Sequence, residues 1–90
     1  MQTGTVEIHY FAAARAAAGC ASETVDVIPA TLGELLDARA TAHTGHTDAG
    51  MSFAEVLERC TFLVDGRHST RDTPLEGASR VDVLPPFAGG

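Results

Sequence analysis

The last two residues of the sequence, Gly89 and Gly90, could carry chemistry that the rest of the chain must position. Glycine has no Cβ, so such a pair can pass through a narrow channel and adopt backbone angles closed to other residues. The reactive group at this end is the terminal carboxylate of Gly90. A free α-carboxylate has a pKa of about 3.3–3.7, so near neutral pH it is ionised and a poor electrophile. It therefore needs activation, for which adenylation by ATP is the usual biological route.

After adenylation, a sulfur donor can displace AMP and leave a thiocarboxylate, a soft nucleophile comparable to an activated cysteine. The sequence has no phosphate-binding loop of its own, so we expect no intrinsic cofactor and an ATP site on a partner enzyme. The alternative is that Gly89 and Gly90 are only a frayed terminus. The preceding residues favour a carrier tail, because Pro85 and Pro86 favour an extended polyproline conformation. Six extended residues reach at most about 20 Å, so we expect a domain over 1–84 and an extended tail over 85–90.

Other residue groups predict less chemistry. The spacing of His43, His46 and Asp48 could bind a metal, but a polar, glycine-containing loop is more often solvated, and we predict no metal site. Cys60 has the helical spacing of a core residue, whereas Cys20 follows a glycine turn and is expected to be exposed. A catalytic thiol would need a base and a pocket, and the sequence indicates neither.

The composition limits the class of protein. Ninety residues form one domain with a modest core, and the net charge of −6 argues against a nucleic-acid partner. No secretory signal and no apolar stretch of about 20 residues is visible, so we expect a cytoplasmic protein without a membrane partner and with reduced thiols. A Cys20–Cys60 disulfide is the alternative. All six basic residues are arginine, and the sequence contains no lysine.

The elements that must position the tail follow from periodicity. Alternation predicts strands over 5–11 and 23–28, separated by an alanine-rich helical turn over 12–18 that ends at Gly19. Capping boxes at Thr31 and Ser52 predict a helix to about Ala42 and a short helix that includes Cys60. Strands are expected over 61–65, 67–69 and 80–84, with an Asp-Gly turn between the first two.

This order predicts an α+β protein of β-grasp (ubiquitin-like) fold. We expect a mixed sheet of four to five strands, with one main helix and a short second helix packed on one face.

Two segments resemble the MoaD family, the small sulfur-carrier subunit of molybdopterin synthase. They are YFAAARAAAG (10–19) and VDVLPPFAGG (81–90). The resemblance implies that a ubiquitin-activating-type enzyme adenylates Gly90 and that a sulfurtransferase forms the thiocarboxylate. It further implies that the tail enters the large synthase subunit, in a heterotetramer, and donates sulfur to cyclic pyranopterin monophosphate.

The resemblance also implies a partner-binding surface formed by Phe11, Arg15, Leu84, Pro85, Pro86, Phe87 and Ala88. Phe87 departs from the family pattern, in which a smaller valine is commoner, and His68 stands near a position that is often apolar. From the residues alone, Phe11 and Phe87 are equally compatible with ordinary packing, and Arg15 with a solvated surface.

Three other functions remain open at this point. The chain could be a sulfur carrier for thiazole or cysteine synthesis, although Pro85-Pro86 and the YFAAAR segment favour molybdopterin synthesis. It could be a ubiquitin-like protein modifier, in which case the absence of lysine would prevent side-chain-linked polymers. It could also be an interaction domain with an inert tail.

Overall fold

A computed structural model describes residues 4–26, 28–43 and 50–86 of the chain. Within these residues the chain forms five strands and three helices. In chain order they are β1 (Val6–Tyr10), α1 (Ala12–Ala18), β2 (Ser22–Val25), α2 (Leu32–Ala42), α3 (Phe53–Leu57), β3 (Thr61–Val64), β4 (Arg67–Ser69) and β5 (Arg80–Leu84). The strands form one sheet in the order β2-β1-β5-β3-β4, which confirms the predicted α+β, β-grasp architecture.

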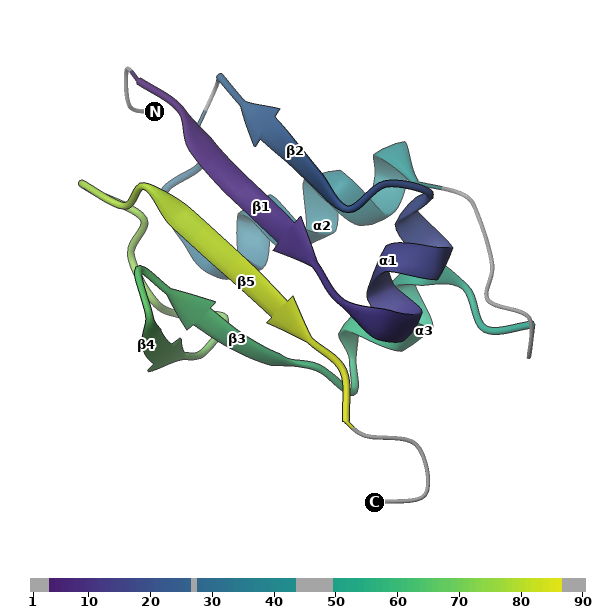
Figure 1. Cartoon of the computed structure of the whole chain (residues 1–90). Helices are drawn as coiled ribbons and strands as arrows, with labels where there is room; N and C mark the ends of the chain where they lie inside the picture. Colours follow the sequence, from purple (N-terminus) through teal and green to yellow (C-terminus); the bar gives the residue numbers. More distant parts are fainter. Residues whose placement is uncertain (1–3, 27, 44–49, 87–90) are drawn as a thin grey trace.

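The centre of the sheet is the parallel pair β1 and β5, and the other neighbours are antiparallel. Tyr10 lies opposite Val83 in this pair, and both are buried. Because side chains alternate along a strand, the residues between the buried positions point to the other face of the sheet. Figure 1 shows the helices on one side of the strands, so the sheet has a helix-covered face and an open face.

The core fills the space between the covered face and the helices. It contains aliphatic side chains from the central strands and from α2, closed by Phe53 of α3. Leu75, in the irregular segment between β4 and β5, is completely buried, so it anchors this segment to the core. The largest fully buried side chains are Phe53, Ile8, Leu32, Leu35, Leu36, Leu75, Val6, Val81 and Val83.

The connection from β1 to β2 contains a full helix, α1, where the sequence predicted a helical turn. It ends at Gly19, whose φ of 79° is left-handed and whose N–H donates to the Arg15 carbonyl. Ala14 and Ala17 are the buried residues of α1, so its small side chains allow a close approach to the sheet and α3. The predicted bounds of the second strand were wrong, since β2 begins at Ser22 and ends at Val25.

Both predicted helix starts are confirmed. The Thr31 hydroxyl accepts from the Glu34 N–H at the start of α2, and α3 begins with a complete capping box between Ser52 and Glu55. The helix that was predicted to include Cys60 is shorter than expected, because α3 ends at Leu57. Cys60 lies beyond α3 in a tighter turn, in which its N–H donates to the Leu57 carbonyl.

Two turns fix the remaining strands. Asp65 and Gly66 have φ of 49° and 82°, as expected for the predicted hairpin turn. The Asp65 carboxylate also accepts from the N–H groups of Ser79 and Arg80, so this turn holds the start of β5. None of the helices within the described residues is long and apolar enough to cross a membrane.

Candidate functional site

The parallel pairing of β1 and β5 brings the ends of both strands to one edge of the sheet. We call the residues there the tail edge: Phe11 after β1, and Leu84, Pro85 and Pro86 at the end of β5. The backbone N–H of Phe11 donates to the carbonyl of Val83 at 3.3 Å, which ties the two strand ends together. In Figure 1 the chain leaves β5 at this edge, beside the start of α1.

Phe11 is the exposed aromatic residue of the tail edge. Its extended backbone directs the ring away from the face that buries Tyr10, and 40% of the residue is accessible to solvent. It is the one large hydrophobic residue that is exposed within the described part of the chain. The structure therefore favours the surface position of Phe11 over ordinary core packing, while its partner contact stays a prediction.

The other predicted site residues divide into two groups. Leu84 and Pro85 are half-buried and Pro86 is exposed, so the chain becomes progressively more accessible as it leaves β5. Arg15 is exposed one helical turn after Phe11, and its N–H donates to the Phe11 carbonyl. The remaining predicted residues are outside the described part of the chain: Phe87, Ala88, Gly89 and Gly90.

His68 lies on β4, opposite Leu63 of β3, and is exposed. The sheet order places β3 between β4 and β5, so His68 is separated from the tail edge by one strand. Its polar side chain therefore makes the open face beside the tail edge more polar and does not form part of the tail edge.

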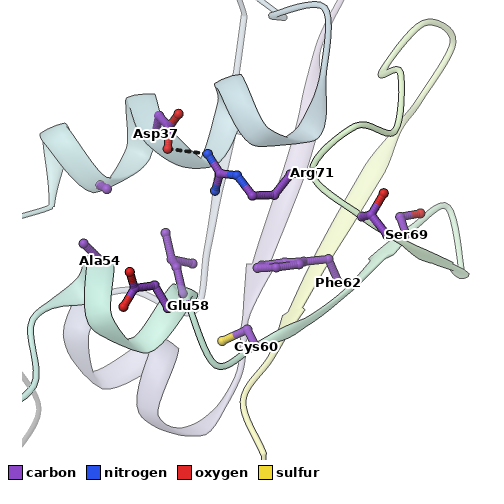
Figure 2. Close-up of a pocket in the computed structure, with 10 residues that line it drawn as sticks. Asp37, Ala54, Glu58, Cys60, Phe62, Ser69 and Arg71 are labelled. Atoms are coloured by element: carbon purple, nitrogen blue, oxygen red, sulfur yellow. Dashed lines mark hydrogen bonds and ion pairs between the residues drawn. The ribbon is translucent and has the colours of Figure 1, made fainter.

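A groove of about 680 Å³ lies on the covered side of the sheet, between α2, α3 and the β3–β4 edge. Figure 2 shows Arg71 paired with Asp37 across one side of it, at 2.6 Å between Arg71 Nη2 and Asp37 Oδ1. Phe62 forms part of its apolar floor, and Cys60 lies at its end. The sequence did not indicate this groove.

The groove lacks an activated nucleophile among its described lining residues. The Cys60 thiol donates to the Val56 carbonyl at 3.1 Å, and burial raises the pKa of this thiol to about 11. A thiol with such a pKa is almost entirely protonated near pH 7 and reacts slowly. Cys20 and Cys60 are both free thiols, so the alternative of a disulfide is not realised in the structure.

A second polar cluster, which the sequence analysis missed, lies at the covered face of β1 and β2. The Tyr10 hydroxyl donates to Glu23 Oε1 at 2.5 Å, and His43 Nε2 lies 2.8 Å from the same oxygen. Arg39 Nη1 lies 3.7 Å from Glu23 Oε2. The rings of Tyr10, His43 and Phe53 pack edge-to-face on one another, which holds the imidazole in place.

The environment shifts two pKa values of this cluster in opposite directions. Burial, followed by the hydrogen bond to Glu23, strongly raises the pKa of Tyr10. Burial would also raise the pKa of Glu23, but the hydrogen bonds from His43 and Tyr10 and the nearby charges outweigh burial and lower it. One signal could have identified the cluster, because Glu23 has the same period-2 phase as Val25, a residue that packs against the core.

The predicted absence of a metal site concerned His43 with His46 and Asp48, of which the last two lie outside the described residues. Among the described residues, one group has metal-ligand character: Cys20, Glu23 and His43.

Comparisons with known proteins agree with this geometry. The ThiS family model matches residues 8–90. The crystal structure of SAMP1 from Haloferax volcanii is similar with a TM-score of 0.71 and 27% identity, covering 97% of this chain and 100% of that chain. A second structure, small archaeal modifier protein 1 from H. volcanii, gives 0.65 and 26%, covering 92% and 98%.

A further similar fold is the putative molybdopterin converting factor, subunit 1, from Pyrococcus furiosus. Its TM-score is 0.64 at 21% identity, covering 92% of this chain and 98% of that chain. No curated protein matches the sequence. Because the family model spans nearly the whole chain and the five-stranded sheet has the ubiquitin-like order, this chain belongs to the ThiS family, within the MoaD/ThiS superfamily.

Proposed function

We propose that this protein is a sulfur carrier whose Gly90 carboxylate is adenylated by a partner enzyme and converted to a thiocarboxylate. One observation carries the proposal: the chain leaves β5 at the edge where the exposed Phe11 ring lies. A partner that binds the apolar tail edge would thereby receive the segment that leads to Gly90.

We further propose that the acceptor is cyclic pyranopterin monophosphate, bound by the large subunit of a molybdopterin synthase. The Pro85-Pro86 segment, the family resemblance of both chain ends and the fold shared with the Pyrococcus furiosus protein support this acceptor. In this scheme ATP is used by the activating enzyme, and the carrier itself holds no cofactor.

A second candidate is a ubiquitin-like modifier that is joined through Gly90 to amines of other proteins. The likeness to the small archaeal modifier protein favours it, since that structure has the higher identity and TM-score. Both functions require the same activated terminus, so they differ in what receives it. The chain has no lysine, so a modifier of this sequence would not form lysine-linked polymers of itself.

Intact mass spectrometry tests the shared step. The chain is incubated with an activating enzyme of the ubiquitin-activating type, ATP and a sulfur source. We expect the mass to rise by the difference between a sulfur and an oxygen atom. As a control, the same enzyme is shown to load a known carrier, that is, to convert its terminal carboxylate to a thiocarboxylate. An unchanged mass of this chain under those conditions would contradict the carrier function.

The acceptor is tested in a second step. Thiocarboxylated protein is mixed with a molybdopterin synthase large subunit and cyclic pyranopterin monophosphate, and molybdopterin is measured. Formation of molybdopterin supports the proposed acceptor. Loading without molybdopterin formation, accompanied by covalent adducts on lysines of added proteins, would favour the modifier.

A further inference from the structure

Three side chains with metal-binding donors meet beside the covered face of β2. Cys20 lies in the turn after α1, Glu23 lies on β2, and His43 caps the C-terminus of α2. The thiol sulfur, a carboxylate oxygen and an imidazole nitrogen of these residues all lie within 4.8 Å of one another. The fold therefore brings together donors that are up to 23 positions apart in the sequence, from Cys20 to His43.

We propose that Cys20, Glu23 and His43 form a binding site for a divalent metal ion of the zinc class. Thiolate, imidazole and carboxylate are the three donor types that Zn²⁺ takes in proteins, usually at tetrahedral geometry. Bond lengths of about 2.0–2.3 Å place tetrahedral ligand atoms about 3.3–3.6 Å apart. The donor atoms lie within 4.8 Å of one another, and an entering ion would replace the 2.8 Å contact between His43 Nε2 and Glu23 Oε1. The fourth position is left to solvent.

The surroundings of Glu23 resemble the outer shell of a metal site. Ligating carboxylates are commonly held by hydrogen bonds from other residues, which fix their orientation. Tyr10 donates such a hydrogen bond to one oxygen of the Glu23 carboxylate, at 2.5 Å. The side chains of Glu23 and His43 are only 21% and 15% exposed, so both donors are already held in place before an ion binds.

The charges of the ligands and of the nearby Arg39 define which ion the site can bind. When an ion enters, the Cys20 thiol passes its proton to solvent and binds as thiolate, and His43 binds as neutral imidazole. Thiolate and carboxylate together neutralise a divalent cation. Arg39 is the opposing charge, and its removal should strengthen binding, by about tenfold for a charge several ångströms from the ion in partly screened surroundings.

This site is independent of the proposed function, because its three residues do not belong to the tail edge. A bound ion would link the turn after α1, strand β2 and the end of α2. We therefore expect it to raise the melting temperature of the domain without being needed for loading of Gly90.

The test uses the full chain, reduced and freed of metal, and titrates it with Co²⁺. A Cys20 ligand produces a thiolate-to-cobalt charge-transfer band in the near ultraviolet, saturating at one equivalent, and Zn²⁺ abolishes it by displacement. Cys20→Ser should lose the band. The matched control is Cys60→Ser, which removes the other half-buried thiol. This variant should keep the charge-transfer band.

A second measurement needs no variant. Zn²⁺ should slow alkylation of Cys20 by iodoacetamide relative to Cys60, as read from peptide masses, and should raise the melting temperature. Arg39→Gln should bind Co²⁺ more tightly than the wild type. Absence of a charge-transfer band in the folded wild type, a band that survives Cys20→Ser, or equal alkylation of Cys20 with and without Zn²⁺ would overturn the proposal.

Discussion

Tyr10 and Phe11 are neighbours in the chain, yet they belong to two regions with different roles. Tyr10 is buried on the covered face, where its ring packs on Phe53 and its hydroxyl donates to Glu23. Phe11 turns to the tail edge, where its ring is exposed. The covered face gathers the contacts that stabilise the domain, whereas the tail edge leaves apolar surface uncovered. The difference teaches that stability and partner binding can be changed separately in this small domain.

The strongest test of this separation is deletion of Gly90. We expect loss of thiocarboxylate formation, because the new terminal carboxylate on Gly89 ends about 3.5 Å short of the position that the Gly90 carboxylate reaches. The melting temperature should be unchanged. Intact mass after incubation with the activating enzyme measures the first quantity, and circular dichroism during heating measures the second. A deletion variant that forms the thiocarboxylate as fast as the wild type would show that the activating enzyme does not require the carboxylate at the position of Gly90.

Phe53→Ala tests the covered face. This side chain is almost fully buried and contacts Tyr10 and His43, so its truncation should lower the free energy of unfolding by about 3–5 kcal/mol. Urea denaturation measures the change. Should the variant remain folded, it should still be loaded at Gly90. A loss below about 1 kcal/mol would mean that the core relaxes around the missing ring.

Phe11→Ala tests the tail edge. Because the ring is exposed, stability should change by less than about 0.5 kcal/mol. Affinity for the activating enzyme or the synthase large subunit should fall about 30-fold, as for an aromatic residue at the centre of an interface. Isothermal titration calorimetry measures the affinity, and an unchanged dissociation constant would remove Phe11 from the docking surface.

A matched pair of arginines sharpens this prediction. Arg15→Ala should weaken partner binding several-fold, by about 1 kcal/mol, as expected for an exposed charge at an interface rim. Arg67 is also exposed, but it follows the Asp65-Gly66 turn, which holds the start of β5 at the opposite edge of the sheet. Arg67→Ala should therefore bind partners like the wild type, and equal losses in both variants would indicate only a general charge effect.

Gly33→Ala should disturb the first turn of α2. A Cβ there would lie 3.1 Å from both the carbonyl oxygen and the Cβ of Arg71, and the Gly33 N–H already donates to that oxygen. We expect a loss of about 1 kcal/mol, since crowding against fixed backbone exceeds the higher helix propensity of alanine. Thermal unfolding measures it. A more stable variant would show that the Arg71 segment moves away freely.

A further effect of similar size depends on pH. The pKa of Glu23 is lowered in the folded state, so its contribution is present above the pKa of the unfolded chain, about 4.3. This contribution is lost as the pH falls through the lower, folded value. Glu23→Gln should lose about 1 kcal/mol at pH 7 in EDTA, and less at pH 3. Urea denaturation at both pH values checks this, and an equal loss at both would contradict the role of the ionised carboxylate.

The local patterns of the sequence determined most elements of the fold. Alternation in β1 and β5, the threonine and serine caps of α2 and α3, Gly19 after α1 and the Asp65-Gly66 turn act over a few residues. Such signals can be read without tertiary context. The predicted end of α3 was wrong. Cys60 continues the apolar spacing of the helix, but after Leu57 the backbone forms a tighter turn that leads into β3.

The sequence by itself also placed a diglycine after Pro85-Pro86 and thereby proposed the tail chemistry. Only the tertiary structure decided that Phe11 is exposed beside the end of β5, because this depends on the parallel pairing of strands about 70 residues apart. The same holds for the meeting of Cys20, Glu23 and His43. Contacts between distant segments are set by sheet order and helix packing, and no local pattern encodes them.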